Sequence, residues 1–356
     1  MTAGHERIDS VEVRLYKLTT RSHLRVGAGE GSVDISAADN PIIRALVYEV
    51  PAGGGEGESK RVPYIPGSSL HGVIRSWVEK ALRSGAEPLT IAELKAGLAD
   101  LKEDEKTTLV NKAKEELRAL WGKTYKEDEA GTEELLRDWK VYVAVCDPMS
   151  EVDRCERISD REGESRRWKE AWQNAIGRGT RGCKVCRIFG YTGQRGRVKI
   201  TPAFPTTDKI PVDIITRVAI NRLTGAAEEG KLFDMEAIPP GVDFYFFVVL
   251  ENLSEGEKAD FEMGIRALSL QLAAVGAHST IGFGMVEVER QFTAKIDKAV
   301  FQKPVEKKVE SILADKQFKR VVPLDESKYP RFFLALASVD SGGKRPDLHG
   351  TVEYAV

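Results

Sequence analysis

One apolar stripe of helical period constrains the fold of this chain more than any other feature of the sequence. Between residues 70 and 82, apolar side chains recur every three or four positions, as on one face of an α-helix. These side chains are Leu70, Val73, Ile74, Trp77, Val78, Ala81 and Leu82. An extended run at 62–65 and the turn residues Pro66 and Gly67 precede the stripe. The sequence therefore predicts a strand, a turn and a helix, with Ser68 or Ser69 as the N-cap.

Extended and helical segments alternate around this unit. Further strands are predicted at 11–15, 42–50, 197–204, 214–223, 242–250 and 285–290. A helix is predicted from Ser254, which forms a capping box with Glu257, to residue 272. The resulting order is that of an α+β, ferredoxin-like (RRM-like) β-α-β-β-α-β fold. RNA-recognition modules use the same sheet, but this sequence has no aromatic-rich run of the kind that stacks bases on it.

A helix-rich segment interrupts this order after the first predicted helix. Thr90 and Glu93 form a capping box at the start of one helix. Apolar periodicity and charge pattern predict further helices at 105–121, 132–139 and 165–175. A strand is predicted at 140–146, where the residues alternate again.

The chain is predicted to have three parts: a core, a helical insertion and a C-terminal extension. Their residues are 1–86 with 188–292 for the core, 87–187 for the insertion and 293–356 for the extension. The core includes a loop at 20–61 and an excursion at 221–240, and the extension includes strands at 331–339 and 350–356.

The charge of the chain is balanced overall but uneven along the sequence. A net charge of −2 argues against a general nucleic-acid binder, so a nucleic-acid site has to be local. Residues 171–207, the basic segment, contain no Asp or Glu, six glycines and seven cations. The cations are Arg178, Arg181, Lys184, Arg187, Arg195, Arg197 and Lys199. We expect either a dock for a polyanion or a solvated loop at this segment.

Apolar runs are short throughout the sequence. None approaches the 18 residues of a membrane-spanning helix, and no signal-peptide pattern precedes Val11. The hydrophobic content of 42% is sufficient for a packed core. The sequence therefore predicts a soluble, cytoplasmic protein with no membrane partner.

The cysteines predict a metal centre. Cys183 and Cys186 form a Cys-x-x-Cys pair, and Cys146 and Cys155 form a second, irregular pair. In a reducing compartment four thiolates suit a tetrahedral Zn²⁺ ion, which would tie the helical insertion to the core. Two alternatives remain open, either His71 in place of Cys146 or buried thiols without a metal. The role of the zinc would be structural, since the sequence shows no open-site set of His and Glu ligands.

Four motifs resemble those of the RAMP superfamily of CRISPR proteins. Residues 64–75 (YIPGSSLHGVIR) resemble its helix-start signature, and 276–284 resemble its Gly-rich loop. Residues 188–190 (IFG) with 196–200 resemble its phenylalanine–glycine element and the next strand. Residues 38–44 fit a loop of the backbone, Csm-type subunit of type III effector complexes.

The resemblance implies a subunit that lies along a CRISPR RNA without reading its sequence. It would form a filament with copies of itself and bind other type III effector subunits. It would also cleave the paired target RNA through Asp39, with Mg²⁺ or another divalent cation helping at the scissile phosphate. The alternative role for Asp39 is an Asx-turn before Asn40 and Pro41.

The expected RNA contacts come partly from this resemblance and partly from the basic segment. They are Arg25, Ser68, Ser69, His71, Arg75, Arg178, Arg181, Arg195, Arg197, Arg222, Gly276, Gly282 and Gly284. Residues 221–230 would be a thumb-like excursion between segments of guide and target. Ile281 departs from the family pattern, in which an Arg is common at that position.

Two other functions remain open at this stage. The first is an architectural RNA-binding RAMP subunit without catalysis. The second is a repeat-processing endoribonuclease of the same superfamily, which needs a histidine near the Gly-rich loop as general acid or base. Only His278 and His23 are available for that role.

Overall fold

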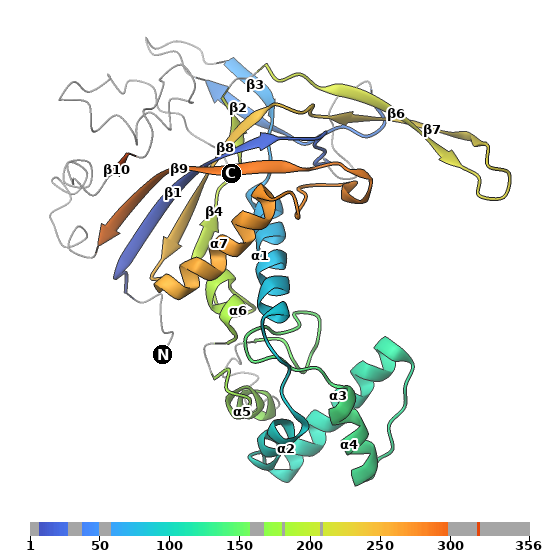
Figure 1. Ribbon diagram of the computed structural model, residues 1–356, viewed down its shortest axis with the longest axis vertical. Coiled ribbons are helices and arrows are strands. Elements are labelled where there is room, and N and C mark those ends of the chain that lie inside the picture. Colours follow the sequence, from blue (N-terminus) through green and yellow to red (C-terminus); the bar gives the residue numbers. More distant parts are fainter. Residues whose placement is uncertain are drawn as a thin grey trace. The chain divides into compact units, whose positions relative to one another are not determined.

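The computed structural model describes residues 7–27, 38–49, 58–156, 167–179, 182–206, 209–297 and 319–320. The protein is an α+β structure with a large sheet, two separate hairpins and several helices (Figure 1). It divides into two compact units. The sheet unit contains residues 8–74, 199–252 and 264–356, and the helical unit contains residues 1–7, 75–198 and 253–263. In the described part of the chain, no helix is both long and apolar enough to cross a membrane.

The large sheet is built around its first strand. β1 pairs antiparallel with both β8 and β9, and the strand order is β10-β9-β1-β8-β4, with β5 paired to β8. The strands are β1 (Ser10–Thr20), β4 (Val198–Ile200), β5 (Phe204–Pro205), β8 (Asp243–Glu251), β9 (Val286–Asp297) and β10 (Lys319–Arg320). Tyr16 of β1 stacks on its partner Phe246 at a ring distance of 5.4 Å, and both are fully buried. On neighbouring positions Leu15 and Phe247 join another buried cluster, so apolar side chains cover both faces of the central strands.

The predicted apolar helix is confirmed as α1 (Gly67–Ser84), and its stripe is buried at Leu70 and Ile74. The N-cap prediction is wrong, because the helix begins at Gly67 and both serines lie in its first turn. The N–H of Ser69 donates to the Pro66 carbonyl at 3.0 Å. The helix can begin at Gly67 because this residue has no side chain and packs directly against the backbone of Ile200.

Replacement of Gly67 by alanine is expected to destabilise the protein. A Cβ atom there would lie 2.4 Å from the Ile200 carbonyl oxygen, so backbone has to move. We expect a loss of about 1–3 kcal/mol in the free energy of unfolding, measured by urea denaturation. Gly72→Ala is the matched control, because a Cβ atom at Gly72 meets nothing within 4 Å. It should stabilise the same helix by roughly 0.5–1 kcal/mol. Equal effects of both changes would contradict the role assigned to Gly67.

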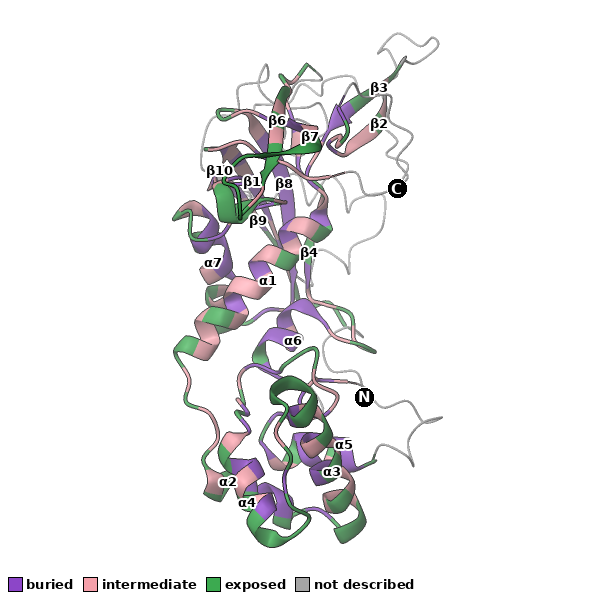
Figure 2. Cartoon of the chain, turned by 90° about the vertical axis from the view of Figure 1, so that its right-hand side faces the viewer, coloured by how far each residue is buried: buried purple, intermediate pink, exposed green. Residues whose placement is uncertain are grey.

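The helical unit has a hydrophobic core of its own. Its helices are α2 (Ile91–Ala99), α3 (Glu103–Trp121), α4 (Glu129–Asp138), α5 (Arg167–Ala175) and the short α6 (Lys184–Phe189). Buried residues of α2 to α5, coloured purple in Figure 2, form one hydrophobic cluster, in which Trp139 and Trp172 stack at 5.2 Å. The predicted capping box is confirmed, since Glu93 N donates to Thr90 Oγ1 at 3.2 Å and Thr90 N donates to the Glu93 carboxylate at 2.8 Å.

Two strand predictions need correction. No strand forms at 140–146, where the carbonyl groups of Tyr142 and Val145 accept hydrogen bonds from the Arg178 guanidinium instead of a neighbouring strand. The strand predicted at 197–204 is divided into β4 and β5, and Pro202 lies between them without an N–H group. The strands predicted at 331–339 and 350–356 lie outside the described residues.

The remaining elements form two hairpins and the second long helix. They are β2 (Arg44–Glu49) with β3 (Glu58–Pro63), β6 (Asp213–Ile220) with β7 (Ala227–Ala237), α7 (Glu255–Ser269) and a 3₁₀ turn, η1 (Ser279–Ile281). The capping box of Ser254 and Glu257 at the start of α7 is confirmed. The β6–β7 hairpin exposes large apolar side chains, among them Ile214, Ile220, Leu223 and Leu232.

Candidate metal centre and nucleic-acid interface

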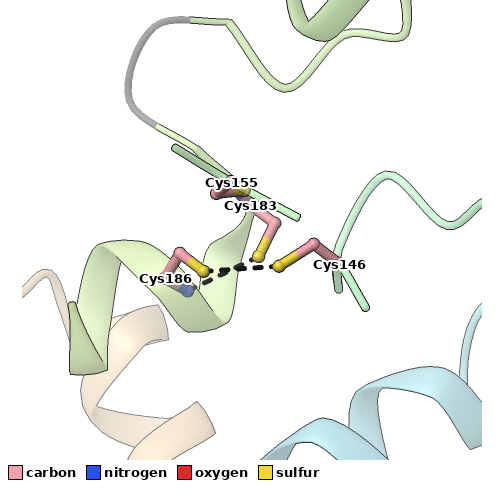
Figure 3. A group of neighbouring side chains, drawn as sticks. All are labelled: Cys146, Cys155, Cys183 and Cys186. Carbon is pink, nitrogen blue, oxygen red and sulfur yellow. Dashed lines mark hydrogen bonds between the residues drawn. The ribbon is translucent and has the colours of Figure 1, made fainter. Parts of the chain in front are cut away.

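The four cysteines come together in the helical unit. Cys146, Cys155, Cys183 and Cys186 are buried, and their sulfur atoms all lie within 4.8 Å of one another (Figure 3). Cys183 is the N-cap of α6, where its sulfur accepts from the N–H of Cys186 at 3.5 Å. All four thiols are free of disulfide bonds. The sulfurs of a tetrahedral site with Zn–S bonds of ~2.3 Å lie about 3.8 Å apart, so this group can hold one metal ion. His71 is not part of the group.

The thiols share their protons unequally. The pKa of Cys183 is lowered, first because Cys146 donates a hydrogen bond to it and then because Cys155 and Cys186 do so. The pKa of Cys186 is raised, chiefly by its hydrogen bond to Cys146. The four thiols are therefore coupled through hydrogen bonds, as expected for sulfur atoms that lie this close together.

An arginine of α1 contacts the cysteine cluster. Arg75 Nη2 lies 3.8 Å from Cys186 Sγ, while Nη1 donates to the Gly190 carbonyl at 3.0 Å and Nε pairs with Glu79 at 2.9 Å. Arg75 was expected at an RNA contact. Its guanidinium links α1 to α6, the helix that carries Cys186, and its side chain remains 22% exposed.

Arg178 of the basic segment is an internal residue. Its side chain is 0% exposed and forms an ion pair with Asp153 at 2.7 Å. Its Nε donates to the Tyr142 carbonyl at 3.1 Å, and Nη1 donates to the Asp153 carbonyl at 2.6 Å. The sequence-based assignment of Arg178 to an RNA-facing surface is therefore wrong, because every nitrogen of the guanidinium is used inside the protein.

Two other cations of the basic segment pair with acidic residues outside it. Arg197 pairs with Glu257 and donates to the Arg187 carbonyl at 2.7 Å. Its side chain is only 11% exposed, so it does not form an open basic surface. Lys199 pairs with Glu251. Arg195 is exposed, and Arg181 lies outside the described residues. The basic segment is therefore not one continuous dock.

Asp39 lies in the sheet unit, against the edge of β7. Its Oδ2 accepts from the N–H of Asp234 at 3.0 Å, and no described residue provides a partner for Oδ1. Asn40 pairs with the same strand, since its N–H donates to the Asp234 carbonyl at 3.1 Å and its carbonyl accepts from Glu236 at 3.1 Å. Pro41 has no N–H for an Asx-turn. One oxygen of an exposed carboxylate is thus fixed by the backbone of β7.

The Gly-rich loop closes on the segment that follows β1. Ala277 N donates to the Arg25 carbonyl and Gly284 N to the His23 carbonyl, both at 2.8 Å. A Cβ atom at Gly276 would lie 2.2 Å from the Arg25 carbonyl oxygen. The close backbone approach expected for RNA at Gly276 and Gly284 is therefore taken by the protein itself. Gly282, with a φ of 89° and no neighbour near its Cβ position, stays open.

This closure assembles a group of residues, of which the sequence predicts roles for Arg25, His23 and His278 but not for Phe283 or Arg217. We call it the Phe283 cluster: Phe283, His23, Arg25, Arg217 and His278. His23 and His278 lie 5.8 and 5.9 Å from the Phe283 ring centre, and the Arg217 guanidinium lies 5.2 Å from it. Two sequence features could have indicated these residues. They are the position of Phe283 between two glycines and the position of Arg217 among the apolar residues of β6.

The remaining expected RNA contacts are spread over the sheet unit. Ser68 is exposed, Ser69 and His71 are half-buried in the first two turns of α1, and Arg222 is exposed at the turn of the β6–β7 hairpin.

Comparison with known proteins gives two similarities. Residues 17–287 match the RAMP superfamily. A segment of 66 residues is 38% identical to a protein of Methanothermobacter thermautotrophicus named CRISPR system Cms endoribonuclease Csm3. That segment is 18% of this chain and 22% of the relative, so the similarity spans about a fifth of either protein. Because the family match extends over most of the sequence, the chain belongs to the RAMP superfamily.

Proposed function

We propose that this protein is a backbone subunit of a type III CRISPR effector complex, which binds CRISPR RNA independently of sequence and cleaves the paired target RNA through Asp39. The observation that carries the proposal is the Asp39 carboxylate, which is exposed and fixed through Oδ2 to β7, while no described residue binds its Oδ1. Membership of the RAMP superfamily and the segment similar to a CRISPR endoribonuclease support it.

The arrangement of Asp39 suits cleavage by the neighbouring 2′-hydroxyl of RNA. A carboxylate fixed beside a phosphodiester can orient a divalent cation such as Mg²⁺, which would stabilise charge at the phosphate. The 2′-oxygen then attacks phosphorus and the bond to the 5′-oxygen breaks, which leaves a cyclic phosphate and a 5′-hydroxyl. Asp39 would position the reacting groups, and the β7 backbone would hold Asp39 in place.

The topology supports a ferredoxin-like core. The elements β1, α1, β4, β8, α7 and β9 occur along the chain in the β-α-β-β-α-β order, with the two hairpins, β5 and the helices α2 to α6 in the connections between them. In the sheet they lie as β9-β1-β8-β4, so the first strand and the third are neighbours in the centre. We assign the helices of residues 87–187, with their own hydrophobic core, to an insertion in this fold.

We assign a structural zinc ion to the cysteine cluster. Four buried thiols without a disulfide match the sulfur set of a closed tetrahedral site. Four thiolates would complete a tetrahedral set, so the assigned role is structural, and catalysis is assigned to Asp39 instead. When bound, the ion would join α6 to the segments that carry Cys146 and Cys155.

Assembly with copies of this chain is part of the proposal. The apolar side chains of Leu223 and Leu232 on the β6–β7 hairpin are exposed, and the contact of such side chains with water is unfavourable in an isolated protein. Burial against a neighbouring subunit or the bound RNA would remove them from solvent. Other type III effector subunits are the further expected partners.

Asp39→Asn tests the catalytic assignment. In the assembled complex with guide RNA, we expect target cleavage to fall by about 100-fold or more, because the amide carries no charge. Guide binding should be unchanged. Asp100→Asn, an exposed aspartate after α2, is the matched control and should cleave normally. Cleavage is measured by gel electrophoresis of end-labelled target.

Three outcomes would replace this function by an alternative. Equal cleavage by the wild type and Asp39→Asn, or none by either with guide still bound, would favour an architectural subunit. Cleavage of repeat RNA by the chain without divalent cations would favour the processing endoribonuclease.

A further inference from the structure

A divalent ion bound by the four cysteines would leave the cluster with net negative charge. Four thiolates carry four negative charges, and an ion such as Zn²⁺ offsets two of them. The other two would be enclosed by protein, since each of the four cysteines is at most 5% exposed. Enclosed charge is unfavourable unless cations or hydrogen-bond donors lie close to it. The residues around the cluster therefore decide how stable the metal-bound form can be.

Backbone N–H groups supply part of this compensation. Cys155 Sγ accepts from the N–H of Cys183 at 3.2 Å, and Cys183 Sγ accepts from the N–H of Cys186 at 3.5 Å. A hydrogen bond to the charged form of a group stabilises that form, so these donors favour thiolates. Neither bond reaches the sulfur of Cys146 or Cys186, which lie 3.5 Å apart. These two cysteines have to be stabilised by other groups.

Arg75 of α1 provides a charged contact to one of these two cysteines. Its Nη2 lies 3.8 Å from Cys186 Sγ, within the range of a hydrogen bond to sulfur. The guanidinium is held there by two other contacts, since Nη1 donates to the Gly190 carbonyl at 3.0 Å and Nε pairs with Glu79 at 2.9 Å. The contact with Cys186 is thus fixed by neighbours on α1 and at the end of α6.

Arg83, about two turns further along α1, lies at the other cysteine. Its Nη2 donates to the Cys146 carbonyl at 2.9 Å. No described carboxylate forms an ion pair with Arg83, and its Nε is buried without a hydrogen-bond partner. Arg178 also binds this segment, through the Val145 carbonyl at 3.2 Å, but it has Asp153 as a counter-ion at 2.7 Å. The charge of Arg83 therefore has no such match.

We propose that Arg75 and Arg83 are positioning residues of the metal centre, whose two positive charges offset the two negative charges that remain when four thiolates hold a divalent ion. The proposal rests on the zinc ion assigned above and adds two residues of α1 to its site. Mutation of residues that orient metal ligands from outside the ligand set typically weakens metal binding by roughly 10- to 100-fold. By this proposal α1, which contributes no ligand, is coupled to the bound ion.

Arg83→Gln tests the effect of the charge in the full-length protein. Zinc affinity is measured by competition with a chromophoric chelator, and we expect it to decrease about tenfold. The double variant with Arg75→Gln should lose about 100-fold, because the two arginines contact different cysteines. Lys80→Gln is the matched control, since Lys80 is an exposed cation of the same helix that lies over the Trp77 ring. It should bind zinc like the wild type.

Lysine variants separate the charge from the hydrogen bonds. Glutamine keeps an N–H donor and loses the charge, whereas lysine keeps the charge and loses the forked geometry of the guanidinium. Arg75→Lys and Arg83→Lys should therefore retain most of the zinc affinity. A merely structural link between α1 and the cysteine segments predicts that lysine and glutamine act alike, because neither reproduces the guanidinium.

The outcomes distinguish this inference from the zinc assignment. Unchanged zinc affinity in the double glutamine variant, or equal losses for lysine and glutamine, would overturn the role of the two arginines while the zinc site remains. Should the double variant not fold, the comparison of Arg83→Gln with Arg83→Lys decides the question. Failure of the wild type to bind zinc stoichiometrically would reject the metal assignment itself. None of these results bears on Asp39, which is tested by cleavage of target RNA.

Discussion

Cys186→Ser is expected to abolish stoichiometric zinc binding and to lower the melting temperature of the protein by about 10 °C or more. Cys186 is 1% exposed, and its sulfur lies 3.5 Å from that of Cys146. The free energy of binding a structural metal contributes directly to folding, so loss of one ligand removes several kcal/mol at once. Zinc is measured by mass spectrometry of the purified protein and stability by calorimetry.

A strong chelator added to the wild type should reproduce the effect of Cys186→Ser, and serine at Cys146, Cys155 or Cys183 should act alike. A different result is expected if the four thiols bind no metal. In that case the serine variants would lose only a small packing contribution, and the chelator would leave the melting temperature of the wild type unchanged. That result would reject the zinc assignment and leave the Asp39 proposal untouched.

Arg178→Gln is expected to reduce the free energy of unfolding by about 3–5 kcal/mol. The change leaves the Asp153 carboxylate buried without its counter-ion, and it removes donors from the carbonyls of Tyr142, Val145 and Asp153. The loss is measured by urea denaturation. Arg195→Gln is the matched control, because Arg195 is an exposed arginine of the same basic segment. It should change stability by no more than about 0.5 kcal/mol.

Arg178→Gln also tests whether Arg178 contributes to RNA binding by the basic segment. Under conditions in which Arg178→Gln remains folded, its RNA affinity should equal that of the wild type, since the guanidinium does not reach solvent. Full stability together with weakened RNA binding would contradict the buried position of Arg178. Asp153→Asn in addition should recover part of the lost stability, because the uncompensated charge is then absent.

Local patterns in the sequence predicted local structure well. The capping boxes at Thr90 and Ser254 involve residues three positions apart, and the α1 stripe repeats within a few turns, so both are visible without tertiary information. The sequence also predicted that the four cysteines lie together, because four thiols in a chain without a disulfide framework indicate metal ligands. Helix ends were less certain, and the start of α1 depended on Ile200, far away in the chain.

Long-range partners explain what sequence reasoning missed. The charge of Arg178 suggested a surface, but its partner Asp153 lies 25 positions earlier, and a count of charges within one segment cannot include it. Asp39 was found through a motif, whereas the strand that fixes it is 195 positions away. The Phe283 cluster combines residues of β6, the Gly-rich loop and the segment after β1, and no single stretch of sequence contains the pattern.

The central position of β1 also has a consequence for synthesis of the chain on the ribosome. Both strands that pair with β1 follow it by more than 200 residues, with Leu18 opposite Phe244 and Val288. At about 5–20 residues per second, β1 emerges and then waits roughly ten seconds to a minute for either neighbour. During that interval its backbone donors and acceptors have no strand to bind. The charged residues Glu12, Arg14 and Lys17, interspersed among its apolar positions, oppose pairing with other nascent chains until β8 arrives.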